Sequence, residues 1–267
     1  MDNTQIPEAF TSVMGLGAPR EYFKVKEINR IGSLIISILL IVGTGILVLY
    51  GVYEAYIWSQ QYGPAMIDDK LIGPLVAGGI MLLFGALAAG SAYANWNRGV
   101  MVYEHGFAYN DRKGMQTWQW INIVSITTAI TRHYHNGIYT GTTHVYTLFN
   151  NQNEKLVFND VFKKVEDLAR NIEQGIYPIL YERAAQAYNS GQTLAFGPVA
   201  INRGGIVIGK KTYPWTDVKQ VSVQNGYVKV SKKDGGWFSG ASASAAVIPN
   251  LKILLSIINQ VVGIKAG

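Results

Sequence analysis

The sequence predicts a two-helix transmembrane hairpin followed by an α+β region that contains the same module twice. Three observations support this: two long uncharged apolar runs, a repeat in the remaining chain, and an amphipathic helix pattern at the end of each copy. The 267 residues are enough for one large domain or two small ones. The chain has no cysteine, which excludes disulfides, thiolate metal ligands and thiol nucleophiles.

The two uncharged runs are Ile31–Tyr53 and Leu71–Asn97. Both exceed the roughly 20 residues that a helix needs to cross a hydrocarbon core of about 30 Å. Buried core helices are the alternative, but a soluble domain rarely holds two such runs without one charge. We therefore expect a membrane hairpin over residues 31–97, with an N-terminal tail and juxtamembrane segment over 1–30 and a connecting loop over 59–70.

Lysine and arginine flank the hairpin on its terminal side, whereas the connecting loop has only Lys70, beside Asp68 and Asp69. The positive-inside rule then predicts that both termini are cytoplasmic in an inner or cytoplasmic membrane. The flanking basic residues are Arg20, Lys24, Lys26, Arg30, Arg98, Arg112 and Lys113.

Small residues lie four apart in the second run, at Gly85 and Ala89 and at Ala86 and Gly90. Such spacing permits close helix packing, either within the hairpin or between two copies of the chain. An oligomeric channel is a further alternative, although neither run carries an ionisable residue at membrane depth.

The chain after residue 97 repeats itself with an offset of 95 residues. GFAY at Gly106 precedes Trp120, and GIVI at Gly205 precedes Trp215. Each copy ends in a helical stripe that follows an asparagine suited to an N-cap. These stripes are Val161, Val165, Leu168 and Ile172 in the first copy, and Leu251, Leu255, Ile258 and Val262 in the second. We expect modules over 98–190 and 191–267, the first with an extra helix after Gly175.

These motifs resemble those of prokaryotic membrane proteins that carry bacterial pleckstrin-homology-like (PH-like) domains. The matching elements are the hairpin, the glycine-led strands, the tryptophan-led strands and the helix entry Ile248-Pro249-Asn250-Leu251. The resemblance covers about residues 31–267. It implies tandem PH-like half-open β-barrels, each closed by a C-terminal helix, and it brings no catalytic residues.

No catalytic motif is present: the sequence has no HExxH, no informative carboxylate pair and no glycine-rich phosphate loop. We therefore expect no enzyme and no cofactor. The alternative is a metal-dependent enzyme, because an exposed hairpin ending at Asn136-Gly137 carries His133 and His135, and a partner strand would bring His144 near. Three imidazoles can hold zinc.

Positive charge accumulates near the C-terminus. Of the net +6, residues 98–190 contribute 9 − 8 = +1 and residues 191–267 contribute 9 − 2 = +7. Each basic residue near an anionic membrane surface is worth about 1 kcal/mol. We expect headgroup contacts, with a merely solvated face as the alternative. The candidate residues are Lys210, Lys211, Lys229, Lys232 and Lys233. In eukaryotic PH domains the first hairpin carries such residues, and we place Lys210-Lys211 in that hairpin of the second copy.

The tryptophans lie in strand patterns, which favours core packing over base stacking, so no nucleic-acid partner is expected. They are Trp118, Trp120, Trp215 and Trp237. Together these features predict a membrane-anchored, non-enzymatic scaffold whose cytoplasmic modules bind protein partners or anionic lipid headgroups. The expected partners are membrane lipids together with a protein partner or further copies of the chain.

Overall fold

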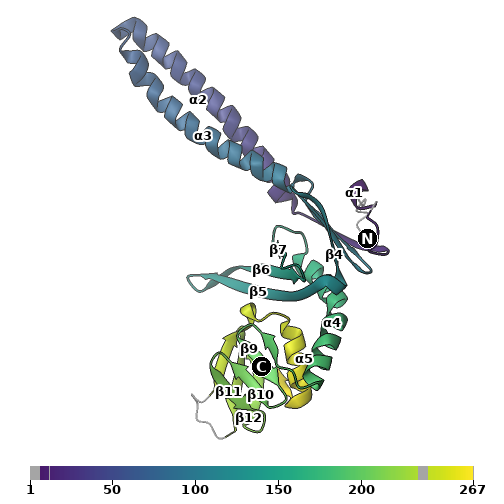
Figure 1. Ribbon diagram of the computed structural model, residues 1–267. Helices are drawn as coiled ribbons and strands as arrows, with labels where there is room; N and C mark the ends of the chain where they lie inside the picture. The colour runs from purple at the N-terminus through teal and green to yellow at the C-terminus, as the bar shows by residue number, and fades with distance from the viewer. Residues whose placement is uncertain (1–6, 12, 234–239, 267) are drawn as a thin grey trace. The chain divides into compact units, whose positions relative to one another are not determined.

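The computed structural model describes residues 7–11, 13–233 and 240–266 (Figure 1). The chain divides into two compact units. One, here the hairpin unit, comprises residues 24–99 and 109–115. The other, here the β-rich unit, comprises residues 1–23, 100–108 and 116–267.

The hairpin unit holds two long antiparallel helices, α2 (Ser33–Tyr62) and α3 (Met66–Trp96), with a π-helical turn at Ile28–Gly32 before α2. The connection is residues 63–65, shorter than the predicted loop over 59–70. Both helices continue through this polar stretch because it has no helix breaker before Gly63, whose φ is 94°.

Small residues line the seam between α2 and α3, as the spacing of Gly85 and Ala89 predicted. A Cβ on Gly51 would lie 2.7 Å from Pro74, and one on Gly85 would lie 3.3 Å from Ile41. The other pair, Ala86 and Gly90, is exposed, and a Cβ on Gly90 would have nothing within 4 Å. The buried seam positions repeat with near-heptad spacing, which suits close antiparallel packing. They are Ser37, Gly51, Ala55, Gly78, Gly85 and Ala92.

The outward surfaces of both helices are apolar. The most hydrophobic windows of Ile28–Tyr62 and Met66–Trp96 have mean hydropathies of 2.6 and 2.2, and only 6% and 11% of them are buried. These helices are therefore not enclosed in a protein core. They are long and apolar enough to cross a membrane.

The first repeat consists of a four-stranded sheet, a three-stranded sheet and a helix, after a short α1 (Glu8–Thr11). The first sheet has the order β1-β2-β3-β4 and the second β5-β6-β7. The elements are β1 (Pro19–Lys24), β2 (Gly99–Tyr103), β3 (Gly106–Asp111), β4 (Gly114–Gln119), β5 (Ile123–His135), β6 (Ile138–Asn150), β7 (Lys155–Asn159) and α4 (Val165–Asn189).

The second repeat has the same order of elements up to its helix, and one further strand follows that helix. Its sheets are β11-β10-β9-β8 and β14-β13-β12-β15, where β15 alone pairs in parallel. The sheets are open rather than closed barrels, and the region is α+β. The elements are β8 (Leu194–Phe196), β9 (Val199–Asn202), β10 (Gly205–Ile208), β11 (Lys211–Pro214), β12 (Val218–Gln224), β13 (Tyr227–Lys232), β14 (Ala241–Ser244), α5 (Leu251–Val261) and β15 (Ile264–Ala266).

The glycine and tryptophan motifs mark the same contact in both repeats. A Cβ on Gly106 would lie 2.2 Å from the carbonyl oxygen of Trp118, and one on Gly205 would lie 2.2 Å from that of Tyr213. Each of these carbonyls lies two residues before the repeat's tryptophan. Trp120 Nε1 donates to the Glu104 carbonyl at 2.9 Å, and Trp215 Nε1 to the Asn202 carbonyl at 2.8 Å. Only glycine permits this close strand approach.

The prediction that residues 1–30 form only a tail and juxtamembrane segment is wrong, because β1 is a strand of the first sheet. β1 has the position in the first sheet that β8 has in the sheet of the second repeat. The chain between β1 and β2 contains the whole hairpin, whereas β8 and β9 are joined by the turn Gly197-Pro198. The segment before β1 is also packed: Leu16 is buried, and the Tyr103 hydroxyl donates to the Phe10 carbonyl at 2.6 Å. The first module is therefore interrupted in sequence by the hairpin.

The extra helix predicted after Gly175 does not exist as a separate element, because α4 continues through Gly175 and Pro178. Gly175 is present for packing: a Cβ there would lie 2.5 Å from Cε2 of Trp120. The helix also begins later than predicted. Val161 lies before it, where its N–H donates to Asn159 Oδ1.

The stripe predicted for the last helix is correct at Ile258, whereas Leu251 and Leu255 are half-buried and Val262 lies just past the end of the helix. The other buried residues of α5 are Ile253, Leu254 and Ile257. In the core, Phe107 packs against Trp118 and Trp120 with ring centroids 5.9 and 5.7 Å apart. Trp215 is half-buried, and Trp237 lies outside the described residues.

Candidate functional site

The outer edge of β5 organises the candidate site. β5 is the first strand of its sheet, so on one side it has no neighbouring strand among the described residues, and the turn Ala245–Val247 of the second repeat lies against it. The N–H and C=O of Ile126 point to that edge, because both bond to Asn250 and not to β6. Main-chain groups alternate along a strand, so those of Thr128, Ile130 and Arg132 face the same edge.

The partner strand supports this register. Ile130 lies opposite His144 in the antiparallel β5–β6 ladder. The His144 N–H donates to Asp160 Oδ2 at 2.6 Å, on the β7 side of β6 and away from β5. Ile130 and His144 therefore form a non-hydrogen-bonded pair. The main-chain groups of Ile130 point away from β6, and those of His144 point away from β5.

Asn250 occupies the inner end of this edge. Its N–H donates to the Ile126 carbonyl at 2.8 Å, and its Oδ1 accepts from the Ile126 N–H at 3.0 Å. Its Nδ2 donates to the Val124 carbonyl at 2.9 Å. Asn250 thus makes the main-chain contacts to β5 that a neighbouring strand would otherwise make there. Asn250 precedes α5 as predicted, but its side chain bonds to β5 and does not cap the helix.

A groove of about 330 Å³ lies between β5–β6, α4 and the start of α5. We call it the inter-repeat groove. Clefts of about 300–1,000 Å³ are typical of ligand sites. Its apolar lining is Ile126, Ile130, Tyr146, Ala169, Ile176, Leu180, Ile248, Leu251 and Ile253. Its charged lining is Glu166, Arg170, Glu173 and Lys252.

Tyr146 lines the groove with a side chain that is 6% exposed. Burial raises the pKa of its hydroxyl, the carboxylates of Glu166, Glu173 and Asp160 raise it further, and Arg170 opposes them. The hydroxyl is therefore protonated at neutral pH and available to donate a hydrogen bond. The lining also holds an ion pair between Lys252 and Glu173, which joins α5 to α4.

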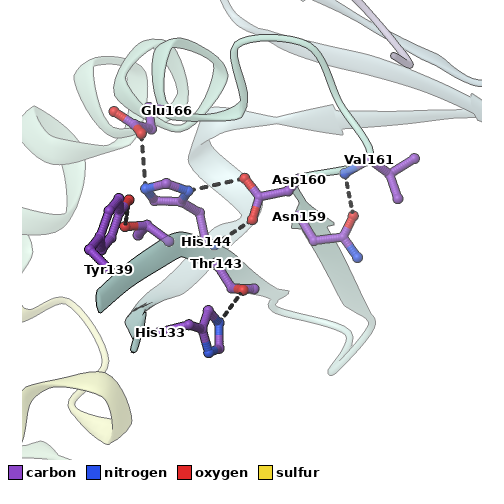
Figure 2. Close-up of polar contacts among 9 residues, drawn as sticks. His133, Tyr139, Thr143, His144, Asn159, Asp160, Val161 and Glu166 are labelled. Atoms are coloured by element: carbon purple, nitrogen blue, oxygen red, sulfur yellow. Dashed lines mark hydrogen bonds and ion pairs between the residues drawn. The ribbon is translucent and has the colours of Figure 1, made fainter. Parts of the chain in front are cut away.

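His144 ties the beginning of α4 to β6 and the segment after β7 (Figure 2). Its Nδ1 lies 3.0 Å from Asp160 Oδ1, and its Nε2 lies 2.9 Å from Glu166 Oε1. Both ring nitrogens thus face carboxylates. This bridge positions the first turn of α4, which forms one wall of the groove.

The structure does not assemble the three imidazoles of the metal alternative. His133 Nε2 lies 2.6 Å from Thr143 Oγ1, on the face of the sheet opposite His144, because adjacent residues of β6 point to opposite faces (Figure 2). His135 ends the exposed tip of β5. Among the residues that the structure describes, no group of three or more His, Asp or Glu could hold a metal ion.

The five candidate lysines do not converge. Lys210 and Lys211 lie at the β10–β11 turn, which is the third turn of its sheet and not the first hairpin as predicted. Lys229 and Lys232 belong to β13 and, three residues apart, face opposite sides. Lys232 Nζ lies 5.9 Å from the Tyr213 ring centroid, and Lys233 follows in a turn.

Lys210 and Lys211 nevertheless line a second cleft, of about 520 Å³. Its other polar side chains are those of Ser242 and Ser244 on β14. Hydroxyl and ammonium donors together suit an anion, although this cleft is more open than the inter-repeat groove.

Sequence reasoning did not identify the inter-repeat groove. It requires α4 to run past Gly175 and the second repeat to dock on β5, and neither follows from hydrophobic periodicity. Asn250 offered the one available signal. A polar residue between Pro249 and an apolar helix predicts an N-cap. This accounts for the place of Asn250 before the helix, but not for the hydrogen bonds of its side chain to β5.

No curated protein matches the chain. A family model described as a family of unknown function (DUF6585) matches residues 5–265. The match spans the hairpin and both repeats together, as expected if the hairpin is an integral part of the first repeat. The chain therefore belongs to this family of unknown function, DUF6585.

Proposed function

We propose that this protein is a membrane-anchored, non-enzymatic scaffold that binds a protein partner in the inter-repeat groove. The observation that carries the proposal is the groove itself: a mainly apolar cleft of about 330 Å³ between the two repeats, lined by β5, β6, α4 and the start of α5. Such a combination of apolar lining and charged rim is typical of binding sites.

The two exposed apolar helices support the membrane anchor. The excess of lysine and arginine on the terminal side supports cytoplasmic termini. A reporter inserted at Pro64 is expected outside the cytoplasm, and a cytoplasmic signal there would contradict this orientation.

The order of elements supports PH-like modules. In each repeat a four-stranded meander is followed by a three-stranded meander and a helix. This order resembles the PH-like arrangement, and domains of that kind are commonly binding modules. Fold likeness alone does not assign a ligand, so the groove carries the functional argument.

The groove is tested by photo-crosslinking the full chain in native membranes. A photoreactive residue at Ile130, 56% exposed on the β5 edge, is compared with one at Tyr227, 47% exposed on β13. We expect one identified protein to crosslink at Ile130 and not at Tyr227. The adduct must disappear with Thr128→Trp, which fills the groove from an edge strand. Equal adducts at both positions, or an adduct insensitive to Thr128→Trp, would contradict the proposal.

Anionic headgroup binding is a second candidate, favoured by the position of Lys210 and Lys211 beside Ser242 and Ser244 in the second cleft. Full chain in nanodiscs of zwitterionic or anionic lipid is treated with an amine-reactive reagent. Anionic lipid is expected to lower labelling of Lys210 and Lys211 relative to Lys155, an exposed lysine of the first repeat. Equal relative labelling in both lipids would remove this candidate.

A further inference from the structure

We infer that the base of the hairpin binds the phosphate of an anionic phospholipid, with Arg30 as the principal contact. The hairpin base comprises residues 24–30, 97–99 and 109–115, all of which belong to the hairpin unit. The inference goes beyond the groove and rests only on the membrane anchor of the proposed function. The site is separate from the second cleft, which belongs to the β-rich unit.

Arg30 lies in the π-helical turn Ile28–Gly32, which packs against α3. Turns of this kind are rare and recur at functional sites. The Arg30 guanidinium carbon lies 5.2 Å from the centroid of the Trp96 ring, at the end of α3. Arginine commonly forms such cation–π contacts, and tryptophan favours the membrane interface. In an inserted hairpin this contact therefore places the arginine charge where headgroups meet hydrocarbon.

The protein leaves the charge of Arg30 incompletely compensated. Its buried Nε has no hydrogen-bond partner among the described residues. Glu27, three residues earlier, pairs instead with Lys24 at 3.2 Å. Asp111 accepts from the Lys113 N–H at 2.8 Å, within its own turn. A guanidinium that lacks a protein acceptor matches the oxygens of a phosphate in both geometry and charge, so this position suits a phosphate.

The turn between β3 and β4 adds positive charge to the hairpin base. Asn110 Nδ2 donates to the Asn97 carbonyl at 3.0 Å, which joins this turn to the end of the hairpin. Arg112 and Lys113 are exposed in the turn. The net charge of the hairpin base is 6 − 2 = +4. Its charged residues are Lys24, Lys26, Arg30, Arg98, Arg112 and Lys113 against Glu27 and Asp111. This excess favours an anionic over a zwitterionic headgroup.

The opposite end of the hairpin has a similar aromatic contact with a different electrostatic setting. Lys70 Nζ lies 4.4 Å from the centroid of the Trp58 ring. However, Lys70 pairs with Asp69 at 3.6 Å. Trp58 Nε1 donates to Glu54 Oε2 at 3.0 Å, and residues 54–70 carry a net charge of 1 − 3 = −2. Carboxylates therefore compensate the cation at this end, and we expect the phosphate site only at the hairpin base.

Native mass spectrometry of the full chain in a neutral detergent tests the site, with phosphatidylglycerol and phosphatidylcholine as probes. The parent should bind its first phosphatidylglycerol about tenfold more tightly than its first phosphatidylcholine. Arg30→Gln should weaken phosphatidylglycerol binding about tenfold, the effect of one lost charge-assisted hydrogen bond. Lys70→Gln is the matched control, because it removes the same charge from the opposite end of the hairpin. It should bind phosphatidylglycerol as the parent does.

A double variant provides a second readout that does not depend on Arg30. Arg112 and Lys113 are exposed in a turn, so replacing both with glutamine removes two charges without disturbing packing. Arg112→Gln with Lys113→Gln should weaken phosphatidylglycerol binding about three- to tenfold. Matching helical signals in circular dichroism would show that the variants fold.

The outcomes separate this site from the proposed function. Equal phosphatidylglycerol affinity in the parent and the folded base variants would overturn the site, and so would an equal loss in Lys70→Gln. Inorganic phosphate bound by the parent as tightly as phosphatidylglycerol would overturn the lipid assignment. Release of the chain from native membranes by alkaline carbonate would overturn the anchor and the site together. The groove is tested separately by the crosslink at Ile130, so its failure would not mimic any of these results.

Discussion

Asn250 and Ile126 hold the two repeats together through a reciprocal pair of hydrogen bonds. The Asn250 N–H donates to the Ile126 carbonyl at 2.8 Å, and the Ile126 N–H donates to Asn250 Oδ1 at 3.0 Å. Asn250 adopts a left-handed backbone with φ of 51°, which asparagine accepts more readily than most residues. The same residue thus turns the chain into α5 and fixes it to β5.

Replacing Asn250 with glycine should therefore destabilise the β-rich unit. Glycine keeps the left-handed backbone but removes both side-chain bonds and leaves the Ile126 N–H without its acceptor. We expect a loss of about 1–3 kcal/mol in the free energy of unfolding. Asn225→Gly is the control, because Asn225 has a φ of 50° in an exposed turn. Denaturant titration followed by tryptophan fluorescence measures both variants, and equal losses would contradict the assignment.

Gly175→Ala should destabilise the protein although alanine is the better helix former. Intrinsic propensity alone favours alanine by about 1 kcal/mol. However, the new Cβ would lie 2.5 Å from Cε2 of buried Trp120, and neither the ring nor the helix can move freely. We expect a net loss of about 1–3 kcal/mol. A thermal melting temperature above that of the parent would show that Trp120 can shift.

Sequence patterns predicted what depends on short-range chemistry. The repeat was predictable because Gly106 and Gly205 meet the same backbone constraint. Gly175 was misread as a helix end. In sequence a glycine that makes room for a distant tryptophan cannot be distinguished from one that terminates a helix.

The place of β1 escaped prediction for a related reason. β1 is separated from β2 by the whole hairpin, so the first module looked complete without it. The three-imidazole alternative failed because strand pairing and side-chain direction are separate questions. His144 does lie on the strand beside His133, but on the other face. Such relationships depend on tertiary register, which periodicity alone does not give.

The bridge at His144 predicts that Asp160 contributes more to the free energy of unfolding than Glu166 does. Asp160 accepts from both the His144 ring and its main-chain N–H, whereas the side chain of Glu166 contacts the ring and is 60% exposed. Asp160→Ala should therefore reduce the free energy of unfolding by about 1–3 kcal/mol, and Glu166→Ala by less than about 1 kcal/mol, because exposed pairs contribute little. Denaturant titration decides this, and the reverse order would contradict the bridge geometry.

Tyr146 predicts an alkaline loss of stability. Burial, then nearby carboxylates, raise its pKa above the ordinary value of 10.0. The folded state therefore holds the proton more tightly than the unfolded state. Its contribution to stability is fully present below pH 10 and is lost as pH rises through the folded pKa. The parent should lose more stability than Tyr146→Phe between pH 9 and 11. Parallel pH curves for the two proteins would contradict this.

The seam of the hairpin predicts a difference between two glycines of one helix. A Cβ on Gly51 would lie 2.7 Å from two carbons of Pro74, whereas nothing lies within 4 Å of a Cβ on Gly45. Gly51→Ala should push α2 away from α3 and cost about 1–3 kcal/mol of hairpin stability. Gly45→Ala should change little. Fluorescence energy transfer between dyes near Gly32 and Trp96, followed during detergent-induced unfolding, measures both. If Gly45→Ala proved the more disruptive, that surface and not the seam would be the packed face.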